Sequence, residues 1–434
     1  MEPNIQTGYE TEKPASKHRK LAMGLSIIPG FGQFYNRQLL KGLIFLVLCG
    51  AFIVAFADMI SLGLWGLVTL GTDVKYDHSI FLLVKGIISL LVILLGLLVY
   101  AYNLYDAYQN GKKRDLGNKL NSVREQYRTL VDSGFPYLMI SPGFILLLFV
   151  VIFPIIFVVL LSFTNYDLYH SPPAKLVDWI GIQNYIDIFK LDIWRQTFFS
   201  VLSWTIIWTF VATTLQVALG VFLAVLVNQK DLMFKKTIRT VFILPWAIPA
   251  FVSILVFAGM FNETVGTINE DILSALGVSI HWMTDPFWTR FALIMIQGWL
   301  GFPFVFAMTT GVLQSIPDEL YEAADVDGAS IFQKFKSITL PLILYATAPI
   351  LITQYTFNFN NFNVIFLFNG GGPAVPNQNA GGTDILISWI YELTMTSAQY
   401  GKAAAITMML SLIVISVAIW QFRKTRSFQE EDMM

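Results

Sequence analysis

The chain has 434 residues, of which 55% are hydrophobic and 13% are charged, and its formal net charge is −1. Soluble domains carry about 25% charged residues, so this composition excludes an ordinary soluble protein and indicates one embedded in lipid. The net charge offers no attraction for nucleic acid, and a single cysteine, Cys49, excludes an internal disulfide. We therefore expect an all-α polytopic membrane protein.

The first 41 residues combine a polar start with an interrupted apolar stretch over 21–40, which contains Pro29, Gly30 and Gly32. A cleaved signal sequence has a short charged start and then an unbroken apolar run, which this segment lacks. We expect a cytosolic tail followed by an interfacial or re-entrant segment.

Eight apolar stretches are long enough to cross a bilayer, which takes ~20 helical residues. They are 42–69, 79–104, 137–162, 199–227, 240–260, 289–313, 341–368 and 403–422. Lys and Arg accumulate on the cytosolic side of membrane proteins. With both termini inside, the inner segments hold 21 of the 28 Lys and Arg residues, so about eight transmembrane helices in an N-in/C-in orientation are predicted.

This orientation leaves three longer outer segments and five regions in chain order. The outer segments are 163–198, 261–288 and 369–402. The regions are a cytosolic tail with the interfacial segment (1–41), two N-terminal spans with a basic cytosolic loop (42–136), a core of six spans (137–426), a cytosolic loop within that core (314–341) and a cytosolic tail (427–434).

The loop over 314–341 contains the charged and apolar sequence EAADVDGASIFQKFKSITLP. Pro317 suits the first turn of a helix, and Asp327 followed by Gly328 suits a turn. A further apolar stripe at helical spacing consists of Ile331, Phe335 and Ile338. The loop should form a short helix–turn–helix, whose apolar face either packs on its own bundle or docks a partner.

Polar residues deep in a membrane usually mark a site or a helix contact. In the seventh span, Gln354, Asn358 and Asn361 follow helical spacing, with Phe357 beside them. A carboxamide both donates and accepts hydrogen bonds, which matches sugar hydroxyl groups, and an aromatic ring matches the apolar face of a sugar. The stripe holds no Lys or Arg, which argues against an anionic cargo.

The sixth span carries a second polar stripe within QGWLGFPFVF. Gln297, Gly301 and Phe304 share a face, Gly301 leaves space, and Pro303 is expected to disturb the helix locally. Two such stripes facing each other would make a neutral cavity for hydroxyl groups. The alternative is that the amides join helices by hydrogen bonds.

The cytosolic loop resembles the EAA motif of ABC-importer permeases, because every position of that motif is filled. These positions are Glu322, Ala323, Ala324, Gly328, Ile338, Leu340 and Pro341. The resemblance implies docking to a cytosolic ATPase. The implied docking residues are Glu322, Ala323, Ala324, Asp327, Gly328 and Phe335. The chain lacks a G-x-x-x-x-G-K-[ST] loop, so we expect no catalytic residue, metal or cofactor here, and ATP-Mg bound by the partner ATPase.

The segments LLSFTNYD, LGFPF, FNFNNF and NGGGP, spread over roughly 137–426, are similar to maltose/maltodextrin permease subunits (MalF-like) of binding-protein-dependent importers. The resemblance implies the type I ABC importer permease fold. The implied sugar-binding residues are Gln297, Leu300, Gly301, Phe304, Gln354, Phe357, Asn358 and Asn361. Gln297, Phe304 and Gln354 depart from the Asn, Tyr and Ser of the well-known subunit, and the outer segment after the third span is too short for the inserted domain found there.

The same resemblance implies an importer for a neutral oligosaccharide, with maltose or maltodextrin as the cargo. The partners would be a second, MalG-like permease, two copies of a cytosolic ABC ATPase and an extracytoplasmic sugar-binding protein, in a bacterial cell membrane. Two alternatives stay open. One is the same machinery with another sugar or polyol, and the other is an ion-coupled secondary carrier, for which Asp58 is the candidate carboxylate.

Overall fold

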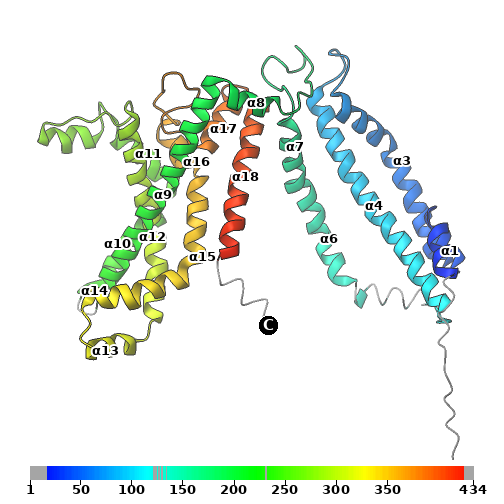
Figure 1. The fold of residues 1–434 in the computed structure, drawn as a ribbon, viewed down its shortest axis with the longest axis horizontal. Helices are drawn as coiled ribbons and strands as arrows, with labels where there is room; N and C mark the ends of the chain where they lie inside the picture. The colour runs from blue at the N-terminus through cyan, green and yellow to red at the C-terminus, as the bar shows by residue number, and fades with distance from the viewer. Residues whose placement is uncertain are drawn as a thin grey trace, which may run out of the picture. The chain divides into compact units, whose positions relative to one another are not determined.

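The structure, a computed structural model, describes residues 17–120, 125, 128, 131–132, 134–229 and 232–424. Contacts within the chain define two units, both of which appear in Figure 1. The N-terminal unit runs to Leu160 and includes Thr164–Trp179, and the C-terminal unit comprises Leu161–Phe163 and the chain from Ile180 onward. In the described residues, regular structure is helical, with isolated β-bridges at Thr164–Trp179 and Ala374–Gly381. The all-α prediction is confirmed.

Seven helical stretches of the described chain are long and apolar enough to cross a membrane, or eight if one bent helix pair is counted. In chain order they are α3 (Leu39–Thr69), α4 (Ser79–Asp115), α6 to α7 (Phe135–Leu147 and Phe153–Leu161, joined by the π-helical turn η1, Leu148–Ile152), α9 (Asp192–Asn228), α12 (Pro286–Ser315), Ile331–Asn369, and α18 (Tyr400–Lys424). The prediction of about eight spans is thus confirmed.

The bent pair replaces the straight span expected over 240–260. Helices α10 (Lys235–Ala247) and α11 (Ala250–Met260) meet at 90°. Ile248 has extended dihedral angles (φ −92°, ψ 131°), because the proline ring of Pro249 disfavours a helical conformation in the residue before it. This pair is either a broken span or a re-entrant loop.

In the N-terminal unit, two short helices close one end of the α3–α4 hairpin. Helices α1 (Lys17–Leu25) and α2 (Phe31–Tyr35) form in and around the interrupted stretch 21–40, and neither is long enough to cross a membrane. Gln33, which is fully buried, donates to the Asn103 carbonyl at 3.0 Å and to the Asp106 carboxylate at 3.2 Å. Polar bonds inside the unit therefore hold these helices against α4.

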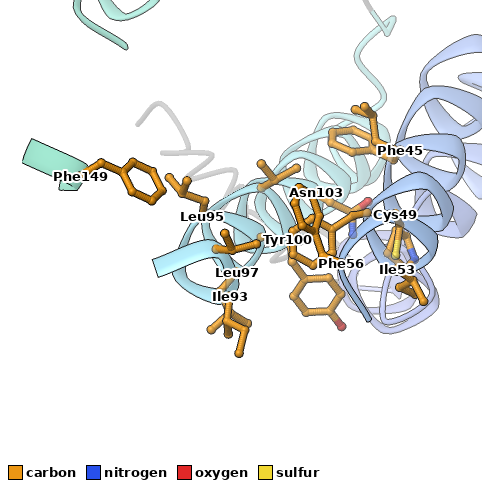
Figure 2. Close-up of a pocket in the computed structure, with 16 residues that line it drawn as sticks. Phe45, Cys49, Ile53, Phe56, Ile93, Leu95, Leu97, Tyr100, Asn103 and Phe149 are labelled. Atoms are coloured by element: carbon orange, nitrogen blue, oxygen red, sulfur yellow. The ribbon is translucent and has the colours of Figure 1, made fainter. Parts of the chain in front are cut away.

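A pocket lies beside α3 and α4 in the same unit (Figure 2). Its volume is about 770 Å³. Its lining includes Phe45, Cys49 and Phe56 of α3 and Leu97 and Tyr100 of α4. Nearly all of this lining is apolar, so the pocket suits hydrocarbon rather than a sugar with many hydroxyl groups.

In the C-terminal unit, α9 packs along α12 and also contacts α15 (Leu340–Phe359). The α9–α12 contact is close because Gly220 has no side chain, and a Cβ there would lie 2.5 Å from the Cβ of Val305. At one end of this unit lie α13 (Asp318–Val326) and α14 (Ile331–Lys334), and at the other lie α8 (Gln183–Lys190) and α17 (Leu386–Met395) (Figure 1).

Candidate functional site

The seventh span is broken at its polar centre. Helix α15 ends at Phe359, Asn360 and Asn361 are outside helices, and α16 (Phe362–Asn369) follows. The span predicted over 341–368 is confirmed as part of the candidate span Ile331–Asn369, but its helix is interrupted at Asn360 and Asn361. Asparagine amides compete with helical backbone bonds. Here the Asn360 amide donates to the Thr356 carbonyl at 3.3 Å, and the indole of Trp208 on α9 donates to the Asn358 carbonyl at 2.9 Å.

The break brings together amide side chains from three parts of the C-terminal unit. Gln297 of α12 donates to Gln216 of α9 at 3.0 Å, and Asn361 donates to Gln297 at 2.9 Å. Asn358 donates to Thr213 at 2.8 Å and to Gln216 at 3.3 Å. Gln216 in turn donates to Gln354 at 3.3 Å, and Asn361 donates to Asn358 at 3.3 Å. We call Gln216, Gln297, Gln354, Asn358 and Asn361 the amide cluster.

The cluster is mostly inside the protein. Gln216 and Asn358 are 0% exposed, Gln297 is 4% and Asn361 is 8% exposed, while Gln354 is partly exposed. The structure thus brings together the four amides that the sequence singled out, although by a broken helix instead of a regular one. These bonds also join helices, so the two interpretations of the amides are compatible in this conformation.

Sequence reasoning missed Gln216. It is an isolated amide within the long apolar run of α9, where a lone polar residue is most simply explained as a helix contact. The pattern of α9 alone does not show that Gln216 faces the two predicted stripes. The available signal was its position as a strongly polar side chain in the middle of a predicted span.

The aromatic and small residues of the predicted site occupy different environments. Phe357 is 62% exposed, in contrast to the buried amides. Phe304 is half-buried and meets Trp246 edge to face, with ring centres 5.8 Å apart, and Leu300 is half-buried within a separate hydrophobic cluster. Helix α12 continues through Pro303 without interruption, although the proline removes one backbone donor from the helix. Gly301 packs against Gln216, whose Cδ would lie 2.6 Å from an added Cβ.

The loop over 314–341 forms the predicted helix–turn–helix. Helix α13 is followed by Gly328, whose φ of +74° is a left-handed value that glycine adopts without strain. A capping box then starts α14: the Ser330 side chain accepts from the Gln333 backbone, and the Gln333 side chain accepts from the Ser330 backbone. A π-helical turn, η4 (Phe335–Thr339), leads directly into α15.

Several residues of this loop are exposed. Among the predicted docking residues, Glu322, Ala323, Asp327 and Gly328 are exposed, and Ala324 and Phe335 are half-buried. Ile331 is 83% exposed and Phe332, which the sequence reasoning did not single out, is 70% exposed. Ile331 and Phe332 are thus not packed within the described chain, whereas Phe335 and Ile338 of the predicted apolar stripe are half-buried.

The glycine-rich segment between α16 and α17 packs on α9 and α12. The Trp204 indole donates to the Thr383 carbonyl at 3.0 Å, and the Arg290 guanidinium donates to the Gly382 carbonyl at 2.8 Å. Asp384 is 4% exposed and accepts hydrogen bonds at 2.7 Å from the Ser388 hydroxyl and the Gly381 amide. Burial raises the pKa of Asp384 to about 6, with a further contribution from the nearby charge of Glu392 and opposition from the two hydrogen bonds.

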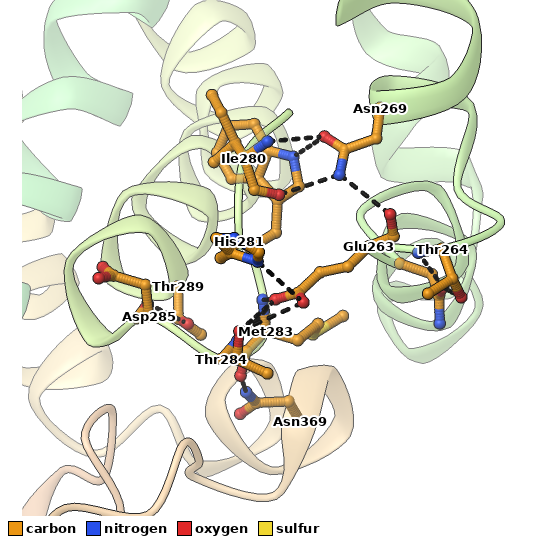
Figure 3. Close-up of polar contacts among 12 residues, drawn as sticks. Glu263, Thr264, Asn269, Ile280, His281, Met283, Thr284, Asp285, Thr289 and Asn369 are labelled. Carbon is orange, nitrogen blue, oxygen red and sulfur yellow. Dashed lines mark hydrogen bonds and ion pairs between the residues drawn. The ribbon is translucent and has the colours of Figure 1, made fainter. Parts of the chain in front are cut away.

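A second outer segment, over 261–285, is organised by Glu263 and Asn269 (Figure 3). The Glu263 carboxylate accepts from the backbone amides of Met283 and Thr284 at 2.7 and 2.8 Å. Burial alone would raise the pKa of Glu263, but these bonds outweigh it and hold the pKa below its usual value. Asn369 of α16 donates to the Met283 carbonyl at 3.4 Å, which connects this segment to the seventh span. Hydrogen bonds thus hold both the glycine-rich segment and the segment 261–285 against the helices of the C-terminal unit.

Comparison with known proteins gives a consistent result. The family described as "Binding-protein-dependent transport system inner membrane component" matches residues 216–427. The galactooligosaccharides transport system permease protein GanP of Bacillus subtilis (strain 168) is 59% identical over 416 residues, which cover 96% of this chain and 100% of that protein. The maltodextrin transport system permease protein MdxF of the same organism is 47% identical over 428 residues, which cover 96% and 98%.

A solved structure supports the fold. The crystal structure of a bacterial ABC transporter involved in the import of the acidic polysaccharide alginate contains a chain that matches with a TM-score of 0.57. The match covers 70% of this chain and 98% of that chain, at 21% sequence identity. At this identity the likeness concerns the fold alone.

Proposed function

We propose that this chain, which belongs to the binding-protein-dependent permeases of ABC importers, carries a neutral oligosaccharide past its amide cluster. The family assignment rests on identities of 59% and 47% over 96% of the chain, and it confirms the resemblance seen in the sequence motifs. The chain is accordingly a sugar-importer permease subunit and a multi-pass protein of the bacterial cell membrane.

The amide cluster is the observation that carries the proposal. It combines five carboxamides, each with donors and an acceptor, and no charged side chain. A hydroxyl group also donates and accepts, so sugar hydroxyls can replace amide–amide bonds without leaving buried groups unpaired. An anionic sugar would need a Lys or Arg that the cluster does not provide.

The proposed cargo can be specified more closely than a neutral sugar. Identity is higher with the galactooligosaccharide permease (59%) than with the maltodextrin permease (47%), and we therefore propose galactooligosaccharides as the first candidate. Maltodextrin, which the sequence motifs implied, is the second candidate. The two differ at hydroxyl positions that hydrogen-bonding side chains distinguish.

The partners are part of the proposal. The exposed loop around Glu322 and Gly328 supports docking of an ATPase, which would bind ATP-Mg and drive the chain between outward and inward access. A second permease, two ATPase copies and a sugar-binding protein would complete the importer. An ion-coupled secondary carrier is disfavoured by the family, and Asp58, its candidate carboxylate, lies on an exposed part of α3.

Uptake and co-purification test this proposal together. Cells that carry the tagged chain are compared with cells that carry Glu322→Ala combined with Gly328→Pro. We expect the wild type to take up labelled galactooligosaccharide and to co-purify with an ATPase and a second permease, and the variant to lose the ATPase and the uptake. An exposed-site control, Glu270→Gln, should behave as wild type. Wild-type cells that import neither neutral oligosaccharide, despite normal amounts of the chain in the membrane, would contradict the proposal.

A further inference from the structure

Gln216 lies at the centre of the amide cluster. It is 0% exposed, and its side-chain oxygen accepts from Gln297 at 3.0 Å and from Asn358 at 3.3 Å. Its side-chain nitrogen donates to Gln354 at 3.3 Å. One residue of α9 therefore contacts amides on both predicted sugar-binding stripes.

The bonds through Gln216 run in one direction. Asn361 donates to Gln297, Gln297 donates to Gln216, and Gln216 donates to Gln354. A carboxamide has an oxygen on one side and an NH₂ group on the other. The orientation of the Gln216 carboxamide therefore determines whether Gln297, Asn361 and Gln354 each turn the oxygen or the nitrogen of their own carboxamide toward the next residue in the chain of bonds.

The ends of this chain of bonds decide what the cluster offers to a ligand. Within the described residues, no protein group bonds to the side-chain nitrogen of Gln354 or to the side-chain oxygen of Asn361. One end thus presents donors and the other presents an acceptor. The partly exposed Gln354 and the exposed ring of Phe357 lie one turn apart or less on α15.

Gly301 makes this arrangement possible. A Cβ at this position would overlap the carboxamide of Gln216, meeting its oxygen and lying 2.6 Å from its Cδ. The glycine that the sequence marked as space for a sugar is therefore also space for Gln216. A side chain at position 301 and a change of Gln216 should disturb the same chain of bonds.

From this geometry we propose that Gln216 is a positioning residue that sets the sugar selectivity of the permease, by fixing the donor and acceptor ends of the amide cluster. The inference rests on the proposed function. It assigns to α9 a role in selectivity in addition to those of the two predicted stripes. The fixed donor and acceptor ends of the amide cluster should discriminate between sugars that differ in the direction of one hydroxyl group.

The test replaces Gln216 by methionine, which is similar in length and has no amide. Cells whose own copy is replaced by Gln216→Met are assayed for uptake of labelled galactooligosaccharide and of maltodextrin, per amount of chain in the membrane. Thr209→Val is the matched control, because Thr209 is buried on the same helix and bonds to the Thr205 carbonyl of that helix.

We expect Gln216→Met to raise the KM for the preferred sugar and to reduce the ratio of the two kcat/KM values about tenfold, the effect of 1.4 kcal/mol of lost discrimination. The maximal rate should change less than twofold, and Thr209→Val should match the wild type. A ratio that stays constant while both rates fall equally would show a merely structural role and overturn the inference. If wild-type cells import neither sugar, the proposed function fails and this inference fails with it.

Gly301→Ala tests the same chain of bonds, and a wild-type ratio in this variant would overturn the inference even if Gln216→Met does not accumulate. The double variant adds a second criterion where both single variants accumulate. Gly301→Ala should reduce the same ratio by a similar factor, and the double variant should reduce it no further than either single variant, because both changes act on one chain of bonds. Reductions that multiply to about a hundredfold would mean that the two residues act independently, which would overturn the inference.

Discussion

Asp384 should make the outer glycine-rich segment more stable at mildly acidic pH. The carboxyl group is 4% exposed, it accepts two hydrogen bonds, and burial raises its pKa to about 6. Two further charges are near: Glu392 opposes ionisation of Asp384, and Arg290 bonds to the carbonyl of Gly382, two residues away. The perturbation that isolates the carboxyl group is Asp384→Asn.

The size and sign of the effect follow from the two pKa values. In the unfolded chain an Asp carboxyl titrates at about 3.9, so the folded protein holds a proton between about pH 4 and 6 that the unfolded chain has already lost. The stability contributed by this group is therefore fully present below about pH 4 and decreases as the pH rises toward and past 6. The total loss is about 3 kcal/mol, and about 1.5 kcal/mol of it falls between pH 5 and pH 7.5.

Thermal unfolding of the purified chain in detergent measures this difference. The wild type should lose about 2 °C more than Asp384→Asn when the pH is raised from 5 to 7.5. Glu270→Gln, which changes an exposed carboxylate, serves as the control and should keep the wild-type slope. Equal slopes for the wild type and Asp384→Asn would refute the reasoning, because the buried carboxyl would then be ionised at no cost to folding.

Two further variants test the packing around the cluster. Trp208→Phe removes the indole donor and leaves the buried Asn358 carbonyl with only the 3.2 Å bond from the Asn361 backbone amide at the helix break; it should cost about 1 kcal/mol in thermal unfolding, while Trp65→Phe on the exposed side of α3 should cost little. Gly220→Ala forces a Cβ against Val305 where α9 meets α12 and should lower the free energy of unfolding by about 1–3 kcal/mol. Gly259→Ala, whose added Cβ would have nothing within 4 Å, should be neutral. Equal melting temperatures for the two glycine variants would show that α9 and α12 do not pack this closely.

The sequence predicted the spans well because each is an apolar run of sufficient length, a property that does not depend on neighbouring helices. It also predicted the helix–turn–helix of the loop, since Pro317, Gly328 and the apolar spacing act locally. The bend before Pro249 also had a local signal, the proline itself, but the prediction of a straight span over 240–260 did not take it into account. Local residues were therefore sufficient for the elements themselves.

The site required information that local patterns do not contain. Asn358 and Asn361 were identified from helical spacing, yet they meet through a break whose buried Asn358 carbonyl accepts from Trp208, more than a hundred residues earlier. Gln216 was missed for the same reason, because its partners lie on α12 and α15. Polar contacts between helices distant in sequence decided both outcomes.

The energies of the hydrogen bonds in the amide cluster are compatible with both helix contact and the proposed sugar binding. Interhelical hydrogen bonds in membranes contribute about 0.6 kcal/mol each, so the five side-chain bonds of the cluster that join different spans together stabilise helix contact by only about 3 kcal/mol. Breaking them in lipid without replacement would leave several buried polar groups unpaired, at a cost of about 1–3 kcal/mol each. A ligand rich in hydroxyl groups removes that larger cost, and a ligand without them does not. For the proposed function, this difference favours opening of the cluster toward a sugar, and the proposed selectivity depends on the donor and acceptor ends that Gln216 fixes.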